Sequence, residues 1–317
     1  MTYGGVKVEK PQGGTAVMNH QQRRLMKKNE ASFLAGFLVL PAAVIVFVAM
    51  IVPLVYAMYM SFFQYGLGQE SKAVFVFFDN YIRFFKDATA LRSLWNTFLF
   101  MGLALFLELL LGIGIAILLT TIPAKLANVM RALFTMPLLI SHVIVGLIWR
   151  YMYDPTYGLV YYVLSWFGLE SFGGLQKTST ALFSIVLADA WHATPFLILV
   201  VSAGLTSIPH DLYEAAKIDG AGALQTLTKI TLPMLSKVIV VITLIRGTDA
   251  FRVFDIIFAL TGGGPANSTS SLSIYAYKQA FENNEMGYAM AVSVITLVGL
   301  LLIFGSLMKN SASGKAG

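Results

Sequence analysis

Long apolar stretches organise this chain. Six of them are long enough to cross a bilayer as helices, because a hydrocarbon core of about 30 Å needs about 20 apolar residues of helix. The first and last carry no Asp, Glu, Lys or Arg, and the second carries only Glu108. They cover roughly 33–60, 94–119, 132–153, 181–206, 234–260 and 286–308. The pattern predicts an all-α integral membrane protein with six transmembrane helices.

Composition and charge agree with a membrane protein. Hydrophobic residues make up 57% of the chain and charged residues 12%, and the mean hydropathy is +0.73. Lys and Arg are more frequent in the first 32 residues and the even-numbered connections than in the others, which places both termini in the cytoplasm. We therefore interpret the net charge of +6 as a topology signal and as attraction to membrane lipid, with no nucleic-acid partner.

The segments flanking the predicted helices suggest a simple domain organisation. Residues 1–32 are basic and lack apolar periodicity, so we expect a disordered cytoplasmic tail. Residues 33–308 form the transmembrane domain, with its core at 94–308, and residues 309–317 form a short cytoplasmic tail. The first helix is too long for a cleavable signal peptide, so we expect it to stay in the membrane. The absence of cysteine excludes disulfides and thiol chemistry.

Two connections on the outer side have recognisable patterns. Residues 79–100 mix aromatic and basic residues at helical spacing, which is typical of an amphipathic segment lying in the membrane interface. The connection from Asp154 to Thr180 is moderately polar and rich in glycine. We expect it to be an outward loop with one short interfacial helix.

Residues 207–233 contain the most informative polar segment. Charged residues at helical spacing alternate with Leu212, Ala215, Ala216 and Ile218. Gly220 and Gly222 then provide a backbone break, and a second short helix precedes Pro233. The pattern predicts a rigid helix-turn-helix on the cytoplasmic face, which suggests mechanical coupling and not catalysis. An ordinary amphipathic loop helix is the alternative.

Three motifs resemble one family. Glu214, Ala215 and Ala216, followed after three residues by Gly220 and after nine more by Ile230 to Pro233, are similar to the EAA loop of ABC importer permeases. VFDIIFALTGGGP at 253–265 and WHATPF at 191–196 resemble the carbohydrate branch, specifically the first permease of a heterodimeric pair. The resemblance covers about residues 33–308.

The resemblance implies a type I importer fold in a bacterial inner membrane and a division of labour between subunits. In such importers the loop helix docks in a cleft of a separate ATPase. This implies ATPase-coupling roles for Glu214 as polar anchor and Gly220 as bend, and for Ala215, Ala216, Asp219, Ile230 and Pro233. The implied partners are a second homologous permease, two copies of the ATPase, an extracytoplasmic solute-binding protein, and a sugar, sugar derivative or polyol. This chain would need no cofactor, because Mg-ATP would bind to the ATPase subunits.

The fifth apolar stretch contains four charges at three-residue intervals: Arg246, Asp249, Arg252 and Asp255. Charges at that depth are costly unless they are paired or wet. We expect Arg246 to pair with Asp249 and Arg252 with Asp255 along one face directed into the bundle. They either lock this helix to its neighbours or line a cavity for sugar hydroxyls. Glu108 either pairs with an Arg of this helix or lies near the inner half of the channel.

The fourth apolar stretch offers further candidates for the substrate pathway. Asp189 and His192 flank Trp191, a combination suited to an aromatic platform with polar groups beside it. Pro195 is expected to bend this helix. Packing against a neighbouring helix is the alternative role. The outer loop from Thr261 to Ser270 is expected to be flexible, and either faces the binding protein or serves as a linker.

Enzyme chemistry finds no support in the sequence. Residues 173–180, GGLQKTST, fail the spacing of a nucleotide loop because Gln176 and not Gly precedes Lys177, and the four histidines lack metal-ligand spacing. Two other classes of function remain as alternatives. One is a gradient-driven secondary transporter in which Asp189, His192, Asp249 and Asp255 titrate. The other is a structural scaffold, which would not explain the polar hairpin.

Overall fold

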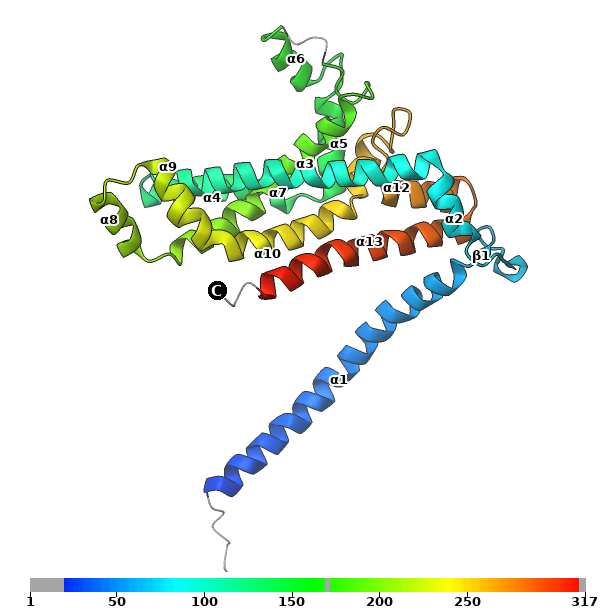
Figure 1. The fold of residues 1–317 in the computed structure, drawn as a ribbon, viewed down its shortest axis with the longest axis horizontal. Helices are drawn as coiled ribbons and strands as arrows, with labels where there is room; N and C mark the ends of the chain where they lie inside the picture. Colours follow the sequence, from blue (N-terminus) through cyan, green and yellow to red (C-terminus); the bar gives the residue numbers. More distant parts are fainter. Residues whose placement is uncertain (1–19, 169–171, 314–317) are drawn as a thin grey trace, which may run out of the picture. The chain divides into compact units, whose positions relative to one another are not determined.

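The computed structural model of the protein describes residues 20–168 and 172–313. Residues 1–19, which make up much of the expected basic tail, lie outside the described residues, as do 169–171 and 314–317. The chain divides into two compact units between Tyr56 and Ala57. Each unit is described by itself (Figure 1).

The first unit contains most of α1 (His20–Met60). The stretch Val39–Met60 of α1 is apolar and long enough to cross a membrane, and nearly all of its side chains are exposed. Pro41 and Pro53 lie inside the helix, as transmembrane helices tolerate. Because α1 begins at His20, residues 20–32 are helical rather than part of a disordered tail.

The second unit is a helical bundle with one small hairpin. Its first half contains β1 (Phe63–Gln64), η1 (Glu70–Lys72), β2 (Val74–Phe75), α2 (Asp79–Lys86), α3 (Ala88–Leu118), α4 (Ala124–Thr135), η2 (Met136–Leu139), α5 (His142–Met152) and α6 (Leu159–Ser165). Its second half contains α7 (Ala181–Thr206), α8 (His210–Ile218), α9 (Ala223–Thr226), η3 (Leu227–Thr231), α10 (Leu232–Phe251), α11 (Asp255–Leu260), α12 (Leu272–Tyr277), η4 (Lys278–Glu282) and α13 (Met286–Ser313). The η3 and η4 segments are π-helical turns. The two strands pair antiparallel, with Phe63 opposite Phe75.

Five helices of the described chain pass as membrane spans by length and hydropathy, and a bent helix pair makes a sixth. The five are Val39–Met60, Ala88–Leu118, Ala181–Thr206, Ala223–Phe251 and Met286–Ser306. The six apolar stretches of the sequence are therefore largely helical, with breaks inside the third and the fifth. The second begins earlier than expected, at Ala88, where the Asp87 side chain accepts hydrogen bonds from the amides of Thr89 (2.7 Å) and Ala90 (3.2 Å).

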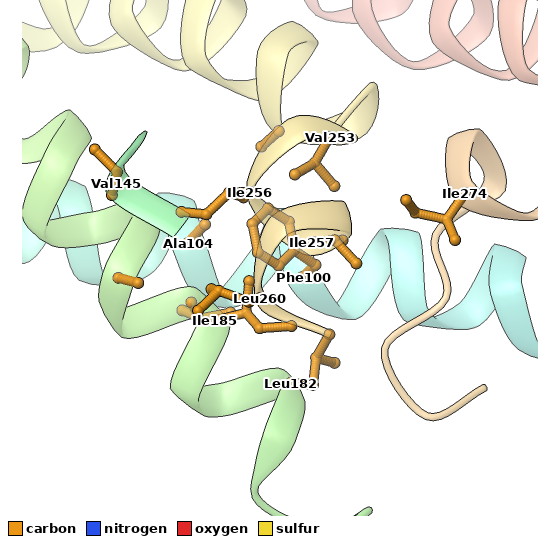
Figure 2. Packing of buried hydrophobic residues seen from close by; sticks show 13 residues of the cluster. Phe100, Ala104, Val145, Leu182, Ile185, Val253, Ile256, Ile257, Leu260 and Ile274 are labelled. Atoms are coloured by element: carbon orange, nitrogen blue, oxygen red, sulfur yellow. The ribbon is translucent and has the colours of Figure 1, made fainter. Parts of the chain in front are cut away.

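Helices α3, α7 and α10 pack against one another and form the frame of the bundle (Figure 1). The most buried is α7, whose side chains face neighbours on nearly every side. Phe100 of α3 and Ile185 of α7 meet Ile257 and Leu260 of α11 in one apolar cluster (Figure 2). This cluster joins the short helix α11 to the long ones.

The third span is not the single straight helix expected for residues 132–153. It consists of α4 with η2, and then α5, bent by 97° at a break between Leu139 and His142. Ile140 adopts an extended backbone there, with φ −94° and ψ 138°. Pro137 lies in the first turn of η2. The apolar run hides this break because its hydropathy is continuous across it.

The fifth span also ends earlier than expected. Helix α10 stops at Phe251, and Asp255 begins the separate helix α11. The four charges between Arg246 and Asp255 therefore do not lie on one face of one helix, and that expectation is wrong.

The loop after α11 is partly buried and held by hydrogen bonds, in contrast to the expected flexible segment. Asn96 of α3 donates to the carbonyls of Asn267 and Ser270, each at 3.1 Å. Ser271 Oγ donates to the Val253 carbonyl at 2.9 Å. These bonds tie the loop to α3 and to the break between α10 and α11.

Candidate functional site

A polar cavity of about 340 Å³ lies between the membrane-spanning helices. His142 of α5, Asp189 of α7 and Arg246 of α10 line it from three elements. The remaining lining comes from the last turn of α10, the break after it and the first turn of α11: Asp249, Ala250, Arg252, Val253, Phe254, Asp255 and Ile256. The cavity therefore gathers five of the seven predicted substrate-pathway residues.

A buried ionic network closes one side of this cavity. Arg246 donates from Nε to Glu108 Oε2 at 2.8 Å and from one terminal nitrogen to Glu108 Oε1 at 2.6 Å. The same nitrogen donates to Asp189 Oδ2 at 2.9 Å. All three side chains are buried. The network connects α3, α7 and α10, and the two-point contact makes Glu108 the principal partner.

These pairs differ from those expected along the fifth stretch. Arg246 bonds to Glu108 and Asp189, not to Asp249. Arg252 pairs with Asp249 at 3.2 Å, and both side chains are about half exposed. Asp255 lies on α11, where its exposed side chain borders the cavity. Of the two alternatives left open for Glu108, the structure shows the pairing with an arginine of the fifth helix.

Trp191 and His192 do not line the cavity. Trp191 is 41% exposed and contacts Trp149 edge to face, with ring centroids 5.9 Å apart. His192 is buried, and its Nε2 lies 2.8 Å from the carbonyl oxygen of Ile140. The structure therefore does not bring Trp191 and His192 to this cavity, since Trp191 turns towards α5 and His192 towards the break before it.

The cavity also contains a residue that the sequence did not single out. His142 is the first residue of α5, and its ring contacts His192 with centroids 4.3 Å apart. Its histidine neighbour lies on another helix, so spacing along the chain could not pair them. A polar residue placed directly after Ser141 in an apolar run was the available signal.

Helices α8 and α9 form the hairpin predicted between residues 207 and 233. Gly220 has φ +73°, a conformation that favours glycine, and it separates α8 from α9. Ala216 faces inwards and is buried, whereas Ala215 and Asp219 are exposed. Glu214 is exposed and its carboxylate lies 3.4 Å from His210 Nδ1. Ile230 lies in the π-helical turn η3, and Pro233 is in the first turn of α10.

Two large apolar side chains project from this hairpin. Ile218 at the end of α8 is 85% exposed and Leu224 of α9 is 73% exposed. A cavity of about 1220 Å³ is lined by Leu224 and other residues of the hairpin and by the ends of α3 and α7. Exposed apolar side chains beside a charged helix face are typical of a protein-binding surface.

Metal binding finds no geometric support in the part of the chain that the structure describes. Within it, no group of three or more His, Asp or Glu side chains has a geometry suited to a metal ion. The charged groups of the cavity instead satisfy one another or face the open space.

Comparisons with known proteins identify the family. The profile of binding-protein-dependent transport system inner membrane components matches residues 108–313. The trehalose/maltose transport system permease protein MalF of Thermococcus litoralis is 36% identical over 284 residues, covering 90% of this chain and 95% of the relative.

Two solved structures are also similar. A bacterial ABC transporter involved in the import of alginate matches with a TM-score of 0.78 and 25% identity, covering 92% of this chain and 99% of that one. A second alginate transporter structure, in complex with an alginate pentasaccharide-bound periplasmic protein, gives a TM-score of 0.75 and 25% identity, covering 90% and 96%. The chain belongs to the family of binding-protein-dependent transport system inner membrane components, and it is a permease component of an ABC importer.

Proposed function

We propose that this chain is the permease subunit of a bacterial ABC importer for a sugar, a sugar derivative or a polyol. The observation that carries the proposal is the α8–α9 hairpin. It bears the pattern from Glu214 to Pro233 between two membrane spans and exposes Ile218 and Leu224. A partner ATPase would hold this hairpin, and ATP hydrolysis would take place in that partner.

The proposed cargo class follows from relatives and from the cavity. The names of the similar proteins refer to trehalose or maltose and to alginate, all of which are carbohydrates. Carboxylates accept and guanidinium groups donate hydrogen bonds, so both suit the hydroxyls of a sugar. We assign Asp249, Arg252 and Asp255 to the cargo path, because their exposed side chains border the cavity.

Arg246 and Asp189 have a different proposed role. The sequence left open whether these charges bind cargo or hold helices together. The buried bonds of Arg246 to Glu108 and Asp189 favour the structural role for Arg246. Asp189 borders the cavity and accepts one bond from Arg246, so it serves both the network and the cavity wall.

The proposed mechanism is alternating access. A binding protein delivers cargo, ATP binding by two ATPase subunits draws α8 inward, and the cavity opens outward to receive the cargo. Hydrolysis of Mg-ATP in those subunits restores the inward-facing state. A second permease completes the pathway, and both termini lie in the cytoplasm. Family membership favours ATP over an ion gradient as the energy source.

Mass spectrometry of proteins that co-purify with a tagged form of this chain, from native membranes in mild detergent, tests the assignment. We expect an ATPase, a second permease and a binding protein. The purified assembly in liposomes should then take up a sugar or polyol only with ATP inside. Recovery of this chain alone, with uptake that needs no ATP, would support the gradient-driven alternative.

A further inference from the structure

The break in the third span leaves a backbone carbonyl that its own helices do not satisfy. Ile140 lies between η2 and α5, and α5 begins its hydrogen bonding with the Val145 amide and the Ser141 carbonyl, at 3.0 Å. Within the described part of the chain, the bond that the Ile140 carbonyl accepts comes from His192. A carbonyl without a partner is costly inside a membrane protein, because the hydrocarbon offers no donor.

His192 is well placed to fix this carbonyl. It is 4% exposed, and it belongs to α7, the most buried helix of the bundle. One helical turn earlier on α7, Asp189 is held by Arg246. Because Nε2 donates to the Ile140 carbonyl at 2.8 Å, the hydrogen of the neutral ring is on Nε2. His192 Nδ1 is buried, and the described part of the chain gives it no hydrogen-bond partner.

The break is connected directly to the polar cavity. His142 follows it by two residues, lines the cavity and contacts the His192 ring. Helix α5 packs along α11, which also lines the cavity with Asp255. A change in the angle at Ile140 would therefore move the α5 wall of the cavity relative to α7.

We propose that His192 is a positioning residue that latches the broken span: its bond to the Ile140 carbonyl holds α5 and His142 in place and so sets access to the cavity. This inference rests on the proposed function only in assigning the cavity to cargo. Breaking the bond opens the cavity without preventing the subunit from folding or assembling. His192 itself does not touch the cargo.

The absence of cysteine from the chain permits a direct test. Ala250 lines the cavity but is 3% exposed, so a reagent reaches a cysteine there mainly when the cavity opens. Ala250→Cys is introduced into the full chain, and the complex that co-purifies with it is treated with a water-soluble maleimide. The rate of labelling of this subunit is followed by its mass, and ATPase activity without binding protein is measured in parallel.

Four further substitutions, each combined with Ala250→Cys, distinguish the effect of the hydrogen bond from the effect of packing. His192→Leu fills space without a donor, His192→Gln places an amide nitrogen near the Nε2 position, and His192→Asn places one near Nδ1, too short to reach Ile140. Thr194→Val is the matched control, because Thr194 is buried on the same helix and its hydroxyl has no partner within the described part of the chain.

We expect His192→Leu and His192→Asn to raise the labelling rate about tenfold, as the loss of one buried hydrogen bond implies. Their ATPase activity without binding protein should rise as well. His192→Gln and Thr194→Val should stay within about twofold of the parent, since the hydrogen bond is kept in both. The Asn and Gln variants differ by one methylene, so this comparison holds even if the Leu variant fails to assemble.

Equal labelling of the Gln and Asn variants would overturn the latch, and so would a Thr194→Val effect as large as that of His192→Leu. The readout does not depend on transport. If labelling follows the expected order but the complex takes up no sugar or polyol, the latch stands and the proposed function fails. If uptake is ATP-dependent but substitutions at His192 do not change the labelling rate, the function stands and the latch fails.

Discussion

Arg246 is the cation that neutralises the buried carboxylates in the interior of the bundle. It has two bonds to Glu108 and one to Asp189, and these three side chains are buried on α3, α7 and α10. Arg246→Met keeps much of the side-chain volume but leaves both carboxylates without a counter-charge. We expect the free energy of unfolding in detergent to fall by about 3–5 kcal/mol, because breaking a buried ion pair leaves an uncompensated charge. Denaturant titration of the purified subunit measures this.

Arg252 provides the matched control for Arg246. It forms an ion pair with Asp249, but its side chain is 60% exposed. Arg252→Met should cost only about 0.5 kcal/mol, since exposed pairs contribute little. The double variant Glu108→Gln with Arg246→Met should be more stable than Arg246→Met alone, because one buried charge is removed. Similar losses for Arg246→Met and Arg252→Met would contradict the structural role of the network.

Asp87 makes the start of α3 sensitive to acid. Partial burial by itself raises the pKa of this carboxyl, but hydrogen bonds from Tyr275 and from the amides of Ala90 and Thr89 outweigh it and lower the pKa below 3.8. Between the lowered pKa and 3.8 the unfolded chain binds more protons than the folded one. The contribution of Asp87 to stability is therefore complete above 3.8 and is lost as the pH falls through the lowered pKa.

Asp87→Asn should reduce this acid sensitivity. The variant keeps a side-chain oxygen for the cap but cannot ionise, so its stability should depend less on pH near the ordinary pKa of Asp. Unfolding temperatures measured from about pH 6 to about pH 3 should fall less steeply for the variant than for the parent protein. Equal slopes would mean that other carboxyl groups dominate the acid response.

At the scale of helices, hydropathy predicted which segments span the membrane but not where they bend. The stretch at 181–206 matches α7, and the stretch at 286–308 begins where α13 begins, although α13 continues to Ser313. The break at Ile140 lies inside an apolar run, where periodicity has no contrast, and the break after Phe251 lies among charges whose regular spacing suggested a continuous helix. Hydrogen bonds from distant residues determine them, such as His192 to Ile140 and Ser271 to Val253.

The same limit applies to the candidate site. Spacing along the fifth stretch suggested partners three residues apart, but Arg246 finds Glu108 across the bundle, 138 positions away in the chain. Charges buried in a membrane protein need partners, so the sequence offered an arginine of the fifth stretch as one alternative for Glu108, without saying which arginine. The sequence could not show that Trp191 lies outside the cavity, because the direction of the Trp191 ring depends on its packing against α5.

Close contact between α3 and α7 depends on a single glycine. A Cβ at Gly112 would lie 2.5 Å from the Cβ of Leu197, whereas a Cβ at Gly114 on the same helix would meet nothing within 4 Å. Gly112→Ala should lower the free energy of unfolding by about 1–3 kcal/mol, because overpacking displaces the two helices. Gly114→Ala should be neutral or slightly stabilising. Denaturant titration in detergent measures both, and equal effects would contradict the packing observed here.

On the scale of the whole molecule, the polar cavity and the α8–α9 hairpin lie at different places along the same helices. The hairpin joins α7 directly to η3 and α10. Helices α7 and α10 both contribute charged residues to the cavity. The frame of α3, α7 and α10 is stiffened by the buried network of Arg246. A displacement of the hairpin can therefore pass to the cavity through two continuous helices that already share one ionic contact.

This arrangement predicts that a change on α8 uncouples transport without unfolding the subunit. Glu214 is exposed and, among the residues that the structure describes, its one ionic contact is the exposed one to His210, so Glu214→Arg should leave the unfolding temperature unchanged. If α8 docks on an ATPase, the reversed charge should reduce the amount of ATPase that co-purifies and lower ATP-dependent uptake in vesicles about tenfold or more, since like charges at an interface cost several kcal/mol.

Glu70→Arg supplies the matched control, because it reverses an equally exposed acidic residue in η1, away from the hairpin. This variant should bind ATPase and transport as the parent does, since it leaves the docking surface untouched. An ionophore should not reduce uptake by either the parent or the control, because a gradient of protons or sodium would not drive it. Normal ATPase recovery and uptake by Glu214→Arg would show that α8 is an ordinary surface helix. The gradient-driven alternative, in which intramembrane charges titrate, would then be the next to test.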